Sequence, residues 1–287
     1  MANTVCLSPL KFYDSTDKWN HKKSYAYGSV APLIMPFNTI DPFQIVASNS
    51  VIEEITSAIL VNYTTKEEHN FTKQFKEAGL AVIDTQEGYK VITFPGIYPI
   101  VDVSHEGLYY IKLIDDDYNF YYSEVFCFSS KTDNLLTIEY WNPESNFKLK
   151  NGVVSFDNNF HFKLRLNTEL GKPEYNFEEE ATKRLGYSFI ESQVSKKIYK
   201  FNTVIPEYVC DAMRIIRLCS NKVITSFGET YDALSFDMSV DWQDQGDLAS
   251  VNCEFETDNI IVNLGGYQYV NSGGDFNKDY NGDFETT

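Results

Sequence analysis

Alternation of apolar and polar residues in the second half of the chain is the feature that most constrains the fold. In FHFKLRLN (160–167), apolar side chains occupy every second position from Phe160 to Leu166, and charged or polar side chains lie between them. The same period of two recurs in LSFDMSVDW (234–242) and VNCEFET (251–257). This period gives a strand one buried face and one wet face, as in antiparallel sheets. The sequence therefore predicts a mainly β protein.

Short apolar runs also mark the region from residue 43 to residue 130. They are rich in aromatic and β-branched residues, and turn-forming pairs such as Pro95-Gly96 and Glu106-Gly107 separate them. About seven short strands at this spacing predict an immunoglobulin-like β-sandwich, although the Cys…Trp…Cys pattern of antibody domains is absent. The stretch 66–78 is compatible with a short helix or with a polar loop.

Four segments are expected along the chain. An extended N-terminal arm covers 1–42, where Pro32 and Pro36 interrupt any regular element, and the immunoglobulin-like sandwich covers 43–130. The polar linker SSKTDN (129–134) leads to a second antiparallel β domain over 135–264. A tail rich in Gly, Asn and Asp covers 265–287.

Two helices are expected as insertions in this second β domain. Asn176 can cap the first, whose acidic first turn and basic last turn match the helix dipole before it stops at Gly186. Phe177, Ala181 and Leu185 form its apolar stripe. Pro206 suits the first turn of the second, which runs through EYVCDAMRIIRLC (207–219). Apolar residues of that segment recur at helical spacing, which indicates one buried face.

The net charge of −17 argues against direct contact with nucleic acid or with an anionic membrane surface. No apolar run approaches the roughly 18 residues that a membrane span needs, so membrane insertion is not expected. Five scattered cysteines without a C-x-x-C pair predict reduced thiols rather than disulfides or a zinc site. The N-terminal stretch lacks the features of a secretory signal, which predicts synthesis in a cytoplasm.

Motifs that carry chemistry are missing from the sequence. It has no G-x-S-x-G, H-E-x-x-H, phosphate-binding or dinucleotide-binding pattern, and its four histidines are not spaced as metal ligands. The string Asp275-x-Asn277-x-Asp279 resembles the start of a calcium-binding loop, but Tyr280 stands where that loop needs glycine. We therefore predict no catalytic residue, no metal, no cofactor and no enzymatic activity.

Two runs in the second half of the chain are YKFNTVIPEYVCDAMRIIRLCS (199–220) and YDALSFDMSVDWQDQGDLASVNCEFETD (231–258). In these runs the chain resembles virion proteins of tailed phages that infect Bacteroidetes, the crAss-like phages in particular. It implies a structural subunit of an oligomeric ring in the tail or in the head-to-tail connector. The implied partners are copies of the same chain and other virion proteins, and the implied location is the virion, after synthesis in the host bacterial cytoplasm.

Aromatic residues in the two terminal segments, and Phe43 directly after the first of them, are the expected subunit contacts. They are Phe37, Phe43, Tyr267, Tyr269, Phe276 and Tyr280. Apolar side chains without periodicity cannot form a core of their own, but they can anchor an arm on a neighbouring subunit. The alternative is a carbohydrate- or receptor-binding β-sandwich, which would carry an exposed, coplanar aromatic patch. A hydrolase would instead need a pocket in which carboxylates or histidines converge.

Overall fold

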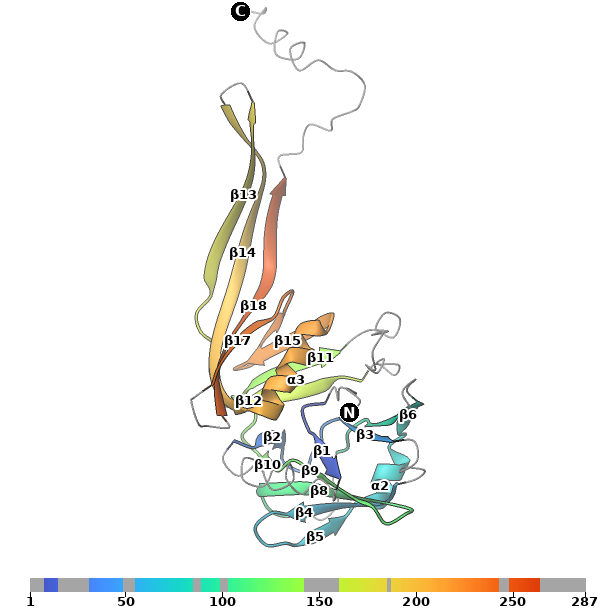
Figure 1. Cartoon of the computed structure of the whole chain (residues 1–287). Helices are drawn as coiled ribbons and strands as arrows, with labels where there is room; N and C mark the ends of the chain where they lie inside the picture. Colours follow the sequence, from blue (N-terminus) through green and yellow to red (C-terminus); the bar gives the residue numbers. More distant parts are fainter. Residues whose placement is uncertain are drawn as a thin grey trace, which may run out of the picture. The chain divides into compact units, whose positions relative to one another are not determined.

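The computed structural model describes residues 8–14, 31–48, 55–84, 89–98, 103–141, 160–184, 187–242 and 248–263. Over these residues the protein is mainly β, with several antiparallel sheets and two helices (Figure 1). The chain divides into a core unit, Met1–Pro173 with Ile198–Thr257, and a ribbon unit, Glu174–Lys197 with Asp258–Thr287. None of the described helices is long and apolar enough to cross a membrane.

A seven-stranded sheet forms one layer of the core unit. Its strands are β1 (Phe12–Asp14), β2 (Leu33–Pro36), β4 (Ile55–Asn62), β5 (Glu68–Asn70), β8 (Gly107–Asp115), β9 (Phe120–Ser123) and β10 (Phe126–Ser129). They run in the order β1-β9-β8-β10-β2, with β4 between β5 and β8. Alternate residues are buried along β10 and along β8 from Ile111 to Asp115, as the period of two requires.

A smaller antiparallel sheet of β3 (Phe43–Ser48), β6 (Ala81–Asp84) and β7 (Tyr89–Phe94) shares a phenylalanine core with this layer. The ring of Phe43 lies 4.9 Å from Phe12 of β1 and 4.8 Å from Phe94 of β7. Phe75 of the short helix α2 (Thr72–Glu77) stacks on Phe94 at 5.1 Å. Aromatic contacts therefore tie both sheets and α2 together.

The prediction that residues 1–42 form an extended arm is wrong for the residues that the structure describes. Strand β1 pairs with β9, and β2 pairs in parallel with β10. Pro36 is tolerated because it is the last residue of β2, at the edge of the sheet. Leu10 and Ile40 are buried, so this segment contributes to the core of its own chain.

The rest of the core unit is built from two four-stranded sheets and α3 (Glu207–Leu218). One sheet has the order β12-β11-β15-β16. These strands are β11 (Leu136–Trp141), β12 (Phe162–Leu166), β15 (Asn221–Ser226) and β16 (Glu229–Asp232). The other sheet has the order β13-β14-β18-β17. Its strands are β13 (Glu174–Arg184), β14 (Tyr187–Pro206), β17 (Asp237–Trp242) and β18 (Leu248–Asn263), of which β13 and parts of β14 and β18 belong to the ribbon unit.

The structure supports the predicted alternation in two of the three segments. Phe162, Leu164 and Leu166 are buried on β12, and Val251, Cys253 and Phe255 are buried on β18. In LSFDMSVDW, however, only Phe236 of the apolar set is buried, and Leu234, Val240 and Trp242 are exposed. The apolar face of β17 is therefore largely uncovered. The helix expected after Pro206 corresponds to α3, whose apolar side faces the core.

No core boundary falls at the predicted linker SSKTDN (129–134). Phe126 and Phe128 before the linker belong to the same buried cluster as Leu136 and Ile138 after it. The compact units instead separate at Glu174 and again at Ile198 and Asp258. Composition indicated a polar turn at 129–134, but a polar turn can also join two strands that share one core.

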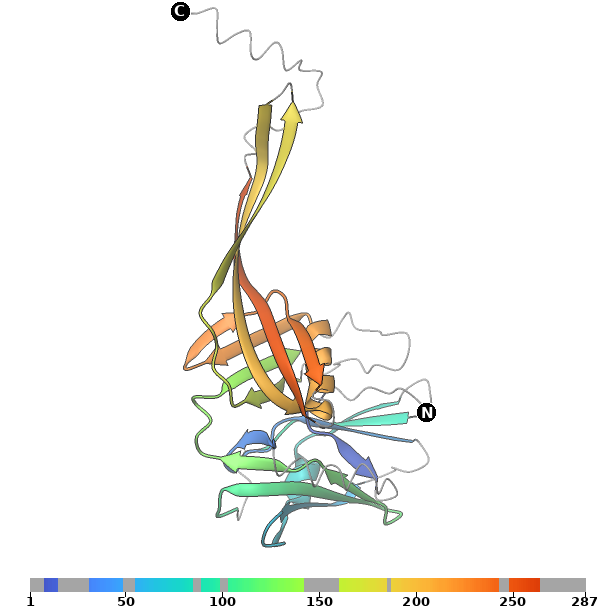
Figure 2. The same cartoon turned by 60° about the vertical axis from the view of Figure 1, so that its left-hand side comes forward.

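The described part of the ribbon unit consists of β13 (Glu174–Arg184), the first residues of β14 and the last residues of β18. In Figure 2 these strands lie side by side and twist about one another. The helix expected from Asn176 to Gly186 is wrong, because this segment is mostly strand. Its apolar stripe was narrow, whereas a hairpin with β14 provides cross-strand partners for its polar side chains.

Candidate interaction surface

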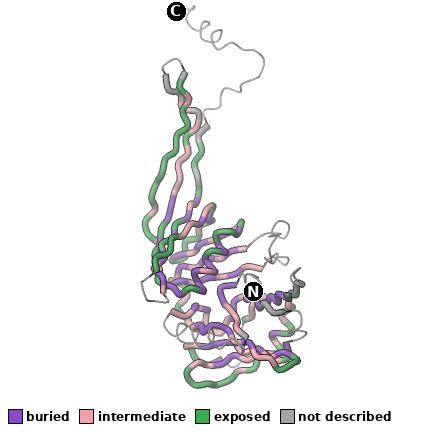
Figure 3. Tube along the Cα trace, viewed as in Figure 1, coloured by how far each residue is buried: buried purple, intermediate pink, exposed green. Residues whose placement is uncertain are grey.

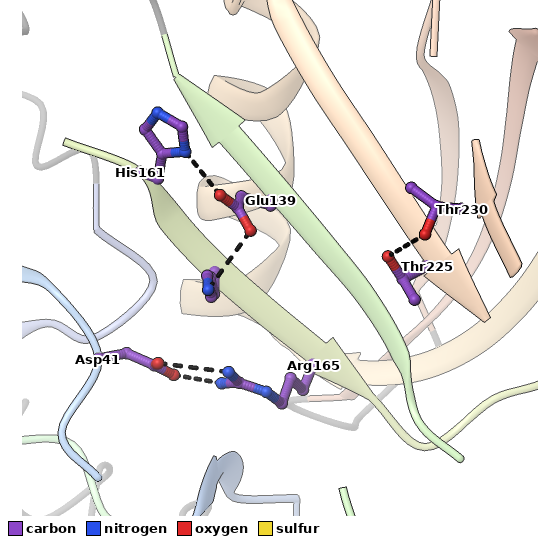
Figure 4. A network of polar contacts seen from close by, with 7 residues as sticks. Asp41, Glu139, His161, Arg165, Thr225 and Thr230 are labelled. Atoms are coloured by element: carbon purple, nitrogen blue, oxygen red, sulfur yellow. Dashed lines mark hydrogen bonds and ion pairs between the residues drawn. The ribbon is translucent and has the colours of Figure 1, made fainter. Parts of the chain in front are cut away.

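The most conspicuous polar cluster lies on the core unit, on β11 and β12. Figure 4 shows His161 and Glu139 facing each other, with 2.6 Å between Nδ1 and Oε1. Lys163 Nζ lies 3.4 Å from the other oxygen of Glu139, and the ring of Trp141 stacks on His161 at 4.1 Å. Each of these side chains already has a neighbour across the strand pair, so the cluster stabilises the sheet. The polar position expected for His161 agrees with this.

A buried ion pair joins the segment before β3 to β12. Arg165 donates through both terminal nitrogens to the carboxylate of Asp41, with 3.3 Å between Nη2 and Oδ1 (Figure 4). The side chains are only 8% and 10% exposed. A buried charge without its partner is strongly destabilising. This doubly hydrogen-bonded pair therefore holds together two parts of the core unit that are distant in sequence.

Two hollows open on the core unit, of about 490 and 570 Å³. His161 and Lys163 line the first hollow, but each of these two side chains is already paired with the carboxylate of Glu139. Cys127 lines the second, and burial, aided by the nearby Glu106, raises the pKa of its thiol. Among the described residues, no group of three or more His, Cys, Asp or Glu is placed to hold a metal ion.

The buried cysteines are poor nucleophiles. Burial raises the pKa of the Cys210 thiol to about 11, and those of Cys219 and Cys253 to about 12. The reactive form is the thiolate, which is scarce near neutral pH for thiols with such pKa values. All three are free in the structure, so they behave as small apolar residues.

The ribbon unit carries the most distinctive surface of the protein. None of its residues whose burial is described is buried, as the green and pink tube of its strands shows in Figure 3. Four large apolar side chains are at least 60% exposed there: Tyr175, Phe177, Ile260 and Ile261. An isolated pair of strands is marginally stable in water, and a ribbon normally needs a covered apolar face. Ile260 and Ile261 follow each other on β18 and so lie on opposite faces, which leaves exposed apolar side chains on both faces of the ribbon unit.

Polar contacts order the hairpin of β13 and β14. Lys196 Nζ lies 2.7 Å from Glu178 Oε1, and Gln193 donates to Glu179 at 2.7 Å. Ser192 donates to Glu180 at 3.3 Å. Because side chains alternate along a strand, Tyr175 and Phe177 lie on one face with Glu179, while Glu178 and Glu180 lie on the other. One face of the hairpin therefore carries the two aromatic rings together with Glu179, and the other carries Glu178 and Glu180.

Of the residues expected to contact other subunits, Phe43 is wrong, because its side chain is fully buried in its own chain. Phe37 is half-buried against the same core and stays a prediction. The other four, Tyr267, Tyr269, Phe276 and Tyr280, lie outside the described residues. Sequence reasoning missed Tyr175 and Phe177 as surface residues, since it placed Phe177 on the inner stripe of a helix. The alternation of polar and aromatic residues in EYNF (174–177) was the available signal.

Comparisons with known proteins found no matching family model, no matching curated protein and no matching solved structure.

Proposed function

We propose that this protein is a non-enzymatic structural subunit that works by binding other protein subunits through its ribbon unit. The observation that carries the proposal is the ribbon unit itself, whose described residues include no buried side chain and several exposed aromatic and aliphatic ones. An exposed apolar surface of this kind marks a site of protein association. The proposed partners are copies of the same chain and other subunits of one particle.

The particle we propose is that of a tailed bacteriophage, with the chain in an oligomeric ring of the tail or of the head-to-tail connector. The resemblance of 199–220 and 231–258 to virion proteins of crAss-like phages supports this assignment. The high negative charge is compatible with protein partners and unfavourable for contact with packaged DNA. In the same proposal, residues 43–130 belong to an immunoglobulin-like sandwich, which the two sheet layers around Phe43 support.

Replacing Tyr175 and Phe177 together with serine is expected to weaken association without unfolding the chain. Both side chains are exposed, so their loss costs the isolated subunit little, whereas aromatic anchors often cost an interface about 2 kcal/mol or more. Sedimentation velocity over a range of concentrations measures the change, and circular dichroism checks the fold.

Phe227→Ser is the matched control, because Phe227 is an exposed aromatic residue in a turn of the core unit. It should leave association unchanged. If both variants lose association equally, the ribbon unit is not the binding surface. The same holds if the unchanged chain is oligomeric and the Tyr175→Ser/Phe177→Ser variant associates as well as it does.

A further inference from the structure

Strand β13 is an edge strand, since β14 is its only hydrogen-bonded neighbour among the described strands. An edge strand presents a row of unpaired N–H and C=O groups, to which a further strand can pair. Natural edges are usually protected by short length, proline or an inward-pointing charge. Strand β13 is 11 residues long and contains no proline, so its charges decide what can pair with it.

The charges of β13 are ordered along the strand. Acidic residues stand at Glu174 and at positions 178–180, and the strand ends with Lys183 and Arg184. A second β13 placed parallel and in register would set like charges against like charges, which is destabilising. An antiparallel β13 would bring the acidic part of each copy towards the basic end of the other. The strand is therefore self-complementary in one direction only.

The same charges select a register. A two-fold axis perpendicular to the sheet keeps residues of one face opposite residues of the same face. An axis through position 178, 179 or 180 would set a glutamate directly opposite its own copy. An axis through Ala181 instead sets the positions of Glu179 and Lys183 opposite each other, and those of Glu178 and Arg184, with no glutamate opposite a glutamate. An axis through Thr182 also avoids opposed glutamates, but it sets only Glu180 opposite Arg184.

We propose that the free edge of β13 binds β13 of a second copy of this chain, antiparallel and centred on Ala181. This inference rests on the proposed function and identifies one partner of the ribbon unit. Glu179 and Lys183 are exposed. The contact of Glu179 within its own chain is to the uncharged amide of Gln193, which leaves the charge of the carboxylate available to Lys183 of the second copy.

The pairing also concerns the apolar side chains. Tyr175, Phe177, Glu179, Ala181 and Lys183 alternate along β13 and share one face. Joining two copies edge to edge places both aromatic pairs on one continuous sheet face. Backbone hydrogen bonds between the two edges then give the affinity, and the paired charges fix direction and register.

Crossed charge reversals test this pairing in the full chain. Lys183→Glu sets glutamates opposite each other at two symmetric positions, and Glu179→Lys does the same with lysines. Two exposed pairs that change from attraction to repulsion should raise the dimer Kd about tenfold in each single variant. The double variant Glu179→Lys/Lys183→Glu should return to the Kd of the unchanged chain. The two single variants, when mixed, should associate with each other more tightly than either does alone.

Glu229→Lys is the control, because Glu229 is an exposed glutamate on β16, another edge strand. Sedimentation equilibrium at low ionic strength provides the Kd values. A dimer that is unaffected by both single reversals, or a double variant that is weaker than either single one, would overturn the proposed register. If the unchanged chain is monomeric but binds a different subunit in a manner that Tyr175→Ser/Phe177→Ser abolishes, the self-pairing is wrong and the proposed function stands.

Discussion

Replacing Asp41 with alanine should lower the free energy of unfolding by about 3–5 kcal/mol, the usual cost of leaving a buried charge without its partner. Arg165 is the charge that loses its partner, and its side chain is only 8% exposed. Urea denaturation followed by tyrosine and tryptophan fluorescence measures the change.

Two further variants serve as controls for this prediction. The double variant Asp41→Leu/Arg165→Met removes both charges and should recover much of the loss, because buried ion pairs are often replaceable by apolar residues. Glu178→Ala removes one partner of an exposed ion pair in the ribbon unit and should change stability by about 1 kcal/mol or less. If Asp41→Ala lowers the free energy of unfolding no more than Glu178→Ala does, the burial of the Arg165 guanidinium is contradicted.

Phe43→Ala should be as damaging, with a loss of about 3–5 kcal/mol, since truncating a buried phenylalanine removes its contacts and leaves a cavity. The ring lies at the centre of the phenylalanine core, against Phe12, Phe75 and Phe94. The same measurement on Phe177→Ala should show a change within about 0.5 kcal/mol, as is usual for surface positions. A small effect of Phe43→Ala would restore Phe43 to the list of subunit contacts and contradict its place in the core.

The parts of the fold that could be predicted are those governed by local periodicity. Alternation located β12 and the inner residues of β18, and the apolar stripe after Pro206 located α3. These patterns are reliable because one face of each element meets the core directly. The same alternation predicts a mainly β protein, and the strands of the described residues confirm it.

The failures come from contacts between distant residues. EYNFEEEATKR (174–184) has acceptable helix capping and charge order, but cross-strand partners such as Lys196 and Gln193 favour a strand. Prolines suggested an arm at 31–42, yet pairing with β10 places that segment in a sheet. Asp41 and Arg165 are 124 residues apart, and no local pattern joins them. The exposed surface of the ribbon unit was missed because 174–184 was assigned to a helix, although the alternation in EYNF (174–177) favours a strand.

Hydrogen–deuterium exchange of the ribbon unit, compared between dilute and concentrated protein, tests the central claim most directly. The described amides of residues 174–184 and 187–197 lie in a hairpin with no described buried residue, so they should exchange fast in the dilute chain. When other subunits cover the ribbon, the same amides should slow, while those of the phenylalanine core stay unchanged. Exchange that is equally slow at both concentrations, or fast at both in an oligomeric sample, would contradict a ribbon unit that works by binding other subunits.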